Sequence, residues 1–376
     1  MQSPFAFGKV VGGDSFTNRT KELANLSSNF DHQVHTILIS PRRWGKTSLV
    51  TKALQDYTSE NEQVRYCKID FFNIREEREF YEILAREVIK STSSRLEEWI
   101  QITREFLKRI TPRFSFGADP VNDFELSFDW SDENMHYEEI LNLPERIAEE
   151  KGIKIIICMD EFQSLTRFND PLLFQNRLRS AWQYHKNVVY CFYGSKKSMM
   201  TTIFQKKSMP FYKFGQIMYL EKIGKQDFSN FIKDGFKRTD KLIEDDQVEM
   251  IVDYMQCHPY YVQQFAHYVW VHTEGKVRGT TLITSLEKML QSNALLYERE
   301  VENLSNSQFN YLKALVGGEE KIGSQKTIDK FRLGSTANIA KIQKALLKKE
   351  IIDKNMGSVE ILDPAFAVWF KYKFIS

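Results

Sequence analysis

The segment from residue 40 to residue 48, Ser-Pro-Arg-Arg-Trp-Gly-Lys-Thr-Ser, has the residue types and spacing of a phosphate-binding loop. Such a loop needs a strand before it, a turn that exposes backbone N–H groups, and a helix whose N-terminus faces the phosphates. Lys46 would then bind the β- and γ-phosphates of ATP, and the Thr47 hydroxyl would bind Mg²⁺. The predicted nucleotide-binding residues of the loop are Ser40, Pro41, Arg42, Arg43, Trp44, Gly45, Lys46, Thr47 and Ser48.

The loop departs from the pattern G-x-x-x-x-G-K-[ST] at its first position, where Ser40 replaces glycine. Pro41 restrains the backbone of Ser40 toward extended conformations, and a serine can still turn there. The alternative is a chance match on a basic loop. The apolar residues 36–39 before the loop and the helical pattern from residue 46 favour the phosphate-binding interpretation.

A second motif is the apolar run of residues 155–159 that ends in Asp160-Glu161. A carboxylate at the end of a buried strand can hold Mg²⁺, directly or through water, which is the role expected of Asp160. Glu161 would then be the general base for the water that attacks the γ-phosphate. Alone, this pattern is typical of any strand that reaches solvent. Together with the loop, it predicts a Walker A and Walker B pair.

Ser195 follows a third apolar run at residues 188–192. A polar residue that leaves the strand beside Walker B can sense the γ-phosphate, although a plain turn serine fits the pattern nearly as well. We predict Glu161, Lys46 and Ser195 as the catalytic residues. Arg177, Arg179 and Lys213 are candidates for a charge-neutralising finger, with exposed surface charge as the alternative for each.

The elements that must position these residues follow from the hydrophobic pattern. Residues 36–39 and 64–71 are predicted strands, and residues 155–159 and 188–192 are continuously apolar, as strands covered on both faces of a parallel sheet require. Helical spacing appears between them, for example at residues 46–57 and 80–89. The pattern predicts an α/β fold with a doubly wound parallel-sheet P-loop NTPase core.

The rest of the chain indicates one insertion and two further domains. Residues 112–116 and 124–128 alternate with period two around Gly117–Pro120, which predicts a hairpin insertion at about 110–130. After residue 221 the pattern is helical and is interrupted at His258-Pro259. From residue 303 it predicts three helices and a two-stranded piece around Asn355-Met356-Gly357, a winged helix. We therefore predict a P-loop ATPase domain at 1–220, a helical lid at 221–299 and a winged-helix domain at 300–376.

Composition excludes several other function classes. The 376 residues carry a net charge of +2, so the whole chain is not an obvious polyanion binder. No apolar run reaches the roughly 18 residues needed to span a bilayer, and the N-terminus lacks a signal-peptide pattern. The four cysteines are widely spaced and fit a reducing cytoplasm. Without a Ser/His/Asp arrangement, an H-E-x-x-H motif or a Cys/His cluster, the only metal implied is Mg²⁺ carried with the nucleotide.

Four motifs together resemble the archaeal-type ATPases, in the signal-transducing (STAND) branch of the AAA-like P-loop NTPases that is related to the origin-recognition ATPases. They are the F-x-x-R-x-x-E segment at 16–22, the loop at 40–48, Asp-Glu-Phe-Gln at 160–163, and His-Pro-Tyr-Tyr-Val-Gln at 258–263. The resemblance implies that Phe16 and Arg19 lie near the adenine. It also implies that a lid carrying His258 and Pro259 closes over the nucleotide, although a lone histidine at a helix start is more often structural.

Three functions remain open from the sequence. The first is a Mg²⁺-dependent ATPase that acts as a nucleotide-gated switch on an unknown protein partner, with homo-oligomer formation possible. The second is an ATP-dependent protein that binds double-stranded DNA through its C-terminal domain, since residues 301–376 hold 12 Lys+Arg against 8 Asp+Glu, a net of +4. Lys341, Lys344, Lys348 and Lys349 would carry that contact, with a solvated helix face as the alternative. The third is a scaffold that binds ATP without hydrolysis.

Overall fold

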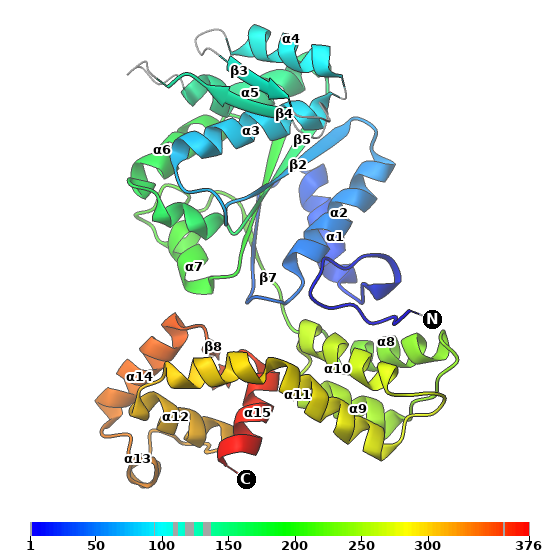
Figure 1. Cartoon of the computed structure of the whole chain (residues 1–376). Coiled ribbons are helices and arrows are strands. Elements are labelled where there is room, and N and C mark those ends of the chain that lie inside the picture. The colour runs from blue at the N-terminus through cyan, green and yellow to red at the C-terminus, as the bar shows by residue number, and fades with distance from the viewer. Residues whose placement is uncertain are drawn as a thin grey trace. The chain divides into compact units, whose positions relative to one another are not determined.

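The computed structural model describes residues 2–93, 95–107, 112–116, 124–130, 137–355 and 358–375. Its contacts divide the chain into two compact units. The first unit is Arg19–Glu221, and the second combines Met1–Asn18 with Lys222–Ser376. Figure 1 draws the elements of both units, which are described one at a time below.

The first unit contains a sheet of five parallel strands in the order β2-β5-β6-β1-β7. The register pairs Ile39 of β1 with Gly194 of β6, and Met159 of β5 with Phe192 of β6. The carboxyl ends of these three strands therefore meet at one edge of the sheet. The predicted doubly wound parallel sheet is confirmed. Its strands are β1 (Thr36–Ile39), β2 (Val64–Asp70), β5 (Lys154–Asp160), β6 (Val188–Gly194) and β7 (Gln216–Tyr219).

Helices cover both faces of this sheet, which explains why its central strands are apolar throughout. Every residue of β1 and of β6 is buried. Figure 1 shows α1 and α2 on one side of the sheet, and α3, α5 and α6 on the other. The helices of this unit are α1 (Thr20–Asp31), α2 (Lys46–Glu60), α3 (Glu77–Thr92), α4 (Leu96–Phe106), α5 (Tyr137–Lys151), the 3₁₀ helix η2 (Phe162–Arg167), α6 (Pro171–Trp182) and α7 (Lys197–Gln205).

The insertion between β2 and β5 is an antiparallel hairpin of β3 (Pro112–Phe116) and β4 (Phe124–Phe128), the two strands that the alternation predicts. The predicted turn between them lies outside the described residues. The inward face of the hairpin packs against the core. Phe124 packs against Trp99 of α4 at 4.8 Å between ring centroids, and the Phe128 amide donates to Glu82 of α3. Period two arises here because only this face is buried.

The second unit is helical, with one short hairpin. Helices α9 and α10 are separated at His258, where the sequence predicts an interruption, and β8 pairs with β9 in antiparallel fashion. The predicted turn residues Met356 and Gly357 lie outside the described residues. The elements are η1 (Gly13–Ser15), α8 (Lys225–Lys237), α9 (Asp245–Tyr254), α10 (Pro259–Val271), α11 (Gly279–Glu302), α12 (Asn306–Val316), α13 (Gln325–Phe331), α14 (Thr336–Lys348), β8 (Ile352–Asn355), β9 (Ser358–Ile361) and α15 (Pro364–Phe374). Within the described ranges, no helix combines the length and apolar character needed to cross a membrane.

The segment up to Asn18 packs with the second unit, although the predicted ATPase domain begins at residue 1. The anchor is Phe5, which is buried against Phe231 and Phe236 of α8 at 5.7 and 5.5 Å between ring centroids. The Ala6 amide also donates to the Gln263 side chain of α10 at 3.0 Å. Burial of the large Phe5 ring stabilises the packing of this segment against α8, although the segment precedes the first unit in the sequence. The further division of the second unit into lid and winged helix stays a prediction.

Two histidines of the first unit are half-buried and neutral. Nε2 of His185 faces Oδ1 of Asn142 at 3.1 Å, and Nδ1 faces the Tyr190 hydroxyl at 2.8 Å. An amide oxygen only accepts, so Nε2 carries the proton and Nδ1 accepts from the tyrosine. His35 stacks on Phe214 at 4.5 Å. Burial lowers the pKa of each histidine to about 4.

These histidines should make the first unit sensitive to acid. Well above pH 6.5 both are neutral in the folded and unfolded states, and their contribution to stability is intact. As the pH falls from 6.5 toward 4, the unfolded chain takes up protons that the folded chain excludes. The free energy of unfolding should therefore fall by roughly 2 kcal/mol per histidine. Urea unfolding at several pH values between 7 and 4.5 measures the slope of the free energy of unfolding against pH.

The control for this prediction is His32, which is exposed. The double variant His35→Phe, His185→Gln should have a flatter pH dependence than the wild type, and His32→Gln should leave the slope unchanged. Equal slopes for all three proteins would contradict the assignment of the acid sensitivity to His35 and His185.

Candidate nucleotide-binding site

The loop after β1 has the backbone of a tight turn. Arg43 and Gly45 both lie in the left-handed region, at φ 63° and 87°. Ser40 is not among the residues of positive φ and is 2% exposed. A glycine is required only where φ is positive or where the backbone makes a close approach. The serine at the head of the loop is therefore compatible with its conformation, whereas Gly45 stands where a side chain would be strained.

Lys46 begins α2 with a buried ammonium group. Its Nζ donates to the carbonyl oxygens of Ser40 at 3.1 Å and Pro41 at 3.0 Å. The loop therefore curls around the lysine, and its carbonyls are neutral acceptors that a charged phosphate can replace. The N-terminus of α2, including Thr47 and Ser48, faces the same space with the positive end of its helix dipole.

Thr47 and Asp160 meet across the sheet edge although they are 113 residues apart in the sequence. The Thr47 hydroxyl donates to Oδ2 of Asp160 at 2.9 Å. Burial raises the pKa of Asp160 to about 6, with opposition from the hydrogen bond of Thr47 and support from the charge of Glu161. A hydroxyl and a carboxylate are the hard oxygen donors that suit Mg²⁺, which usually takes few protein ligands and completes its shell with phosphate and water. No group of three or more His, Cys, Asp or Glu side chains suited to a metal is found in the described ranges.

Glu161 and Ser195 lie at the same edge, at the ends of neighbouring strands. Ser195 is buried, and its hydroxyl donates to Oε2 of Glu161 at 2.8 Å. Nε of Arg42, in the loop, approaches the Ser195 oxygen at 3.4 Å. Glu161 itself is a non-glycine residue in the left-handed region, at φ 49°. Such a conformation is uncommon, and it directs the side chain out of the line of β5.

Arg19 supports the phosphate-binding loop through hydrogen bonds of its guanidinium group. Its buried guanidinium donates to Glu22 at 2.8 Å, to the backbone oxygen of Glu221 at 2.6 Å and to the backbone oxygen of Trp44 at 3.4 Å. It therefore joins the start of α1, the chain after β7 and the loop. These contacts support the loop, and the place of Arg19 near the adenine, which the resemblance implies, stays a prediction.

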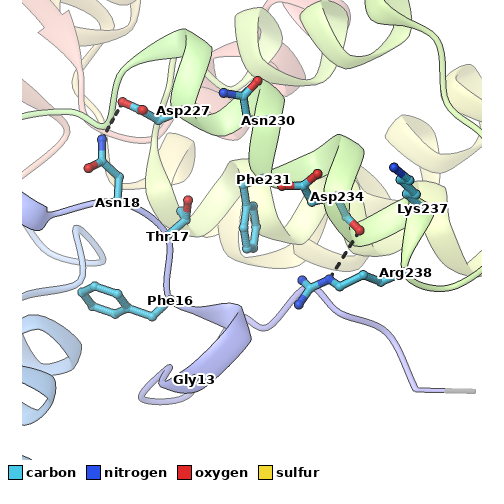
Figure 2. Close-up of a pocket in the computed structure, with 10 residues that line it drawn as sticks. All are labelled: Gly13, Phe16, Thr17, Asn18, Asp227, Asn230, Phe231, Asp234, Lys237 and Arg238. Carbon is cyan, nitrogen blue, oxygen red and sulfur yellow. Dashed lines mark hydrogen bonds between the residues drawn. The ribbon is translucent and has the colours of Figure 1, made fainter.

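The other predicted residues, Phe16, His258 and Pro259, belong to the second unit. His258 precedes Pro259 at the start of α10, is buried, and contacts the ring of Tyr261 at 4.8 Å between centroids. Phe16 lines an open pocket of about 850 Å³ against α8. Figure 2 shows this pocket between the N-terminal segment and α8, with Asn18 directed at Asp227. The nucleotide contacts of these three residues stay predictions.

All three finger candidates are engaged within the first unit, where Lys213 lies over the ring of the adjacent Tyr212. Arg177 forms an ion pair with Glu77 at 2.7 Å and lies over the Tyr137 ring, so an arginine finger here would have to break both contacts. Arg179 lies over the ring of Phe214. Gln163, which has no predicted role, donates from its side chain to Glu161. The only signal for it was its place in the Asp-Glu-Phe-Gln motif.

Comparison with known proteins agrees with this arrangement. A family model described as an ATPase domain predominantly from Archaea matches residues 16–265. The chain belongs to this ATPase family. A second model, described as a probable winged helix domain, matches residues 295–372. The predicted archaeal-type ATPase family and the predicted C-terminal winged helix are both confirmed by these matches. A search of curated proteins found no match.

Several solved structures share this fold over nearly the whole chain. The Walker-type ATPase PABY2304 of Pyrococcus abyssi is 18% identical, with a TM-score of 0.66 over 95% of this chain and 97% of that one. The ORC2 protein of Aeropyrum pernix, in ADPNP–ADP complexes, is 14% identical, with a TM-score of 0.57 over 99% and 100%. The ORC1 protein of the same organism, in complex with DNA, is 10% identical, with a TM-score of 0.52 over 99% and 98%. At these identities the likeness shows the fold alone.

Proposed function

We propose that this ATPase-family protein binds ATP with Mg²⁺ and hydrolyses it to ADP and phosphate. The observation that carries the proposal is the contact between Thr47 and Asp160, at 2.9 Å, beside Lys46 and Glu161. Two motifs far apart in the sequence thereby form one oxygen-lined site next to a buried ammonium group and a possible base. The ADPNP–ADP complexes of the Aeropyrum pernix ORC2 protein support a nucleotide as the ligand.

In this proposal the side chains divide the work of phosphoryl transfer. Thr47 and Asp160 would hold Mg²⁺, which would supply charge neutralisation for the phosphates. Lys46 exchanges its loop carbonyls for phosphate oxygens. Water attacks the γ-phosphorus and loses its proton to the Glu161 carboxylate, as the bond to the β-phosphate oxygen breaks and ADP leaves. Ser195, which donates to Glu161, senses whether the γ-phosphate is present.

The experiment that tests the proposal is Mg²⁺-dependent phosphate release by the full chain, with ATP binding measured in parallel. Binding accompanied by steady phosphate release is the expected result. Binding without release, at any Mg²⁺ concentration, would favour a scaffold that holds ATP without turnover. Absence of binding would overturn the proposal as a whole.

We further propose that nucleotide turnover drives a switch in which the second unit moves as one body. The support lies in contacts between its lid and winged-helix parts. The Tyr261 hydroxyl of α10 donates to Asp363 at the start of α15. Lys222, at the entry to the unit, forms an ion pair with Glu360 of β9 at 2.8 Å. A ligand that favours one position of the lid would therefore also bias the position of the winged helix.

Double-stranded DNA is a second candidate ligand, carried by the exposed face of α14. Lys341, Lys344 and Lys348 are exposed there at helical spacing, while Ile342 and Leu346 face the core. Lys349 is engaged otherwise, because it donates to Asn303 and Gln308. The DNA complex of the Aeropyrum pernix ORC1 protein, which has the same fold, adds support.

Substitution of the three exposed α14 lysines tests the DNA proposal. Lys341→Gln, Lys344→Gln and Lys348→Gln combined should weaken DNA binding and reduce the slope of log affinity against log salt by up to about 3, since each phosphate contact contributes about 0.9. The control removes the same charge from exposed positions of the first unit, Lys206, Lys207 and Lys213. If the wild type fails to bind duplex DNA even at low salt, DNA is not a ligand. Equal effects of the two triple variants would indicate non-specific attraction.

A further inference from the structure

A buried glutamine contacts the carboxylate proposed as the general base. Gln163 is 1% exposed, lies in η2 just after β5, and donates through Nε2 to Oε2 of Glu161 at 2.5 Å. We propose that Gln163 is a positioning residue, which holds Glu161 in the orientation needed to take a proton from the attacking water. This inference rests on the proposed ATPase function and adds a residue to it.

The hydrogen bonds leave one carboxylate oxygen for catalysis. Gln163 and Ser195 both donate to Oε2 of Glu161, from η2 on one side and from the end of β6 on the other. Among the described residues no donor is recorded for Oε1. Two donors on one oxygen fix the plane of the carboxylate and leave the second oxygen as the proton acceptor. Glu161 is thereby held at its side chain as well as by its left-handed backbone.

The position of Gln163 is itself fixed by packing. The side chain passes over Gly194 of β6 so closely that a Cβ added at this glycine would lie 2.0 Å from Oε1 of Gln163. The carboxylate also fixes which way round the amide is placed, because an amide oxygen directed at Glu161 would be repelled. Gly194 and Glu161 therefore leave the amide a single arrangement.

The amide is unfavourable for stability, which argues against a purely structural role. Oε1 of Gln163 is buried, and within the described part of the chain it has no hydrogen-bond partner. A buried carbonyl oxygen without a partner loses its hydration without compensation. A methionine of similar length would fill the same space without this penalty. The hydrogen bond to Glu161 is what the glutamine provides and the methionine would not.

The first unit contains a matched control. Gln175 of α6 is also 1% exposed, also has a buried Oε1 without a partner among the described residues, and also donates through Nε2, in this case to the backbone oxygen of Pro171. It does not contact Glu161. Gln163→Met and Gln175→Met therefore remove the same chemical group from equally buried sites of one unit, and only the first removes a donor to the base.

The experiment compares these two variants with the wild type in the full chain. Gln163→Met should lower kcat by about 10- to 100-fold, with KM and the Kd for ATP changed less than about threefold, since misplacement of a reacting group affects the transition state more than binding. Its thermal midpoint should equal or exceed that of the wild type. Gln175→Met should keep the kcat of the wild type. An unchanged kcat in Gln163→Met, or equal losses in the two variants, overturns the positioning role.

A double variant shows whether Gln163 acts through Glu161. In single-turnover reactions with long incubation, Gln163→Met should have no further effect on the residual rate of Glu161→Gln. A loss of the same factor in both backgrounds would mean that Gln163 acts elsewhere, and would overturn the inference while leaving the ATPase proposal intact. A wild type that binds ATP without releasing phosphate would overturn the ATPase proposal first, and the inference with it.

Discussion

Lys46→Ala should lose both ATP binding and phosphate release. The substitution removes a buried ammonium group that, in the proposed complex, exchanges the carbonyls of Ser40 and Pro41 for phosphate oxygens. A charge-assisted contact of this kind, made in a buried site, is worth several kcal/mol when it is truncated. We expect the Kd for ATP to rise by roughly 10²- to 10³-fold. Titration with ATP by calorimetry measures this directly.

The matched control for Lys46→Ala is Lys52→Ala. Lys52 lies on the same helix but is paired at the surface with Asp56, so its loss should change neither binding nor turnover measurably. Thermal unfolding of both variants shows whether the first unit remains folded. Wild-type affinity in a folded Lys46→Ala protein would remove the phosphate-binding role from this loop.

Glu161→Gln should separate binding from hydrolysis. Glutamine keeps the size of the side chain and its oxygen but does not accept a proton at neutral pH. We expect ATP to bind within about threefold of the wild-type affinity while kcat falls by about 10²- to 10⁴-fold, the usual contribution of a general base. Phosphate release in a single turnover, with retention of labelled ATP on the protein, measures the two quantities in one preparation.

The control for Glu161→Gln is the same substitution at an exposed glutamate. Glu60→Gln, at the exposed end of α2, should behave as the wild type. A Glu161→Gln variant that hydrolyses ATP at the wild-type rate would contradict the general-base assignment, and with it the positioning role of Gln163. If instead ATP binding is also lost, the carboxylate serves the Mg²⁺ site rather than the proton transfer.

The fold was predictable to the extent that each element is encoded by its own residues. The runs at 155–159 and 188–192 are apolar without alternation because both faces of those strands are covered. The hairpin strands alternate because one face is buried. β7 (Gln216–Tyr219) was missed because this edge strand is short and half exposed. Helix α15 (Pro364–Phe374) was missed because apolar residues surround most of it and leave no helical period to read.

The location of the candidate site was predictable from the residues that follow the parallel strands. Parallel strands bring their carboxyl ends to one edge, so the loop after β1, the Asp160-Glu161 pair and Ser195 could be expected to converge. The contact of Thr47 with Asp160 agrees with that expectation. Gln163 could not be assigned from the sequence, because its direction depends on the left-handed turn at Glu161 and on the absence of a side chain at Gly194.

The sequence by itself determined the family, the parallel sheet and the identity of the phosphate-binding loop, because these depend on local residue types, spacing and periodicity. The tertiary structure decided which groups face one another. It paired Gln163 and Ser195 on one oxygen of Glu161, gave Arg19 to the loop, and placed Phe5 with the second unit. Gln163 is only two residues from Glu161, but its direction is set by the turn and by Gly194, and the other contacts join residues far apart in the sequence that only packing of the whole unit brings together.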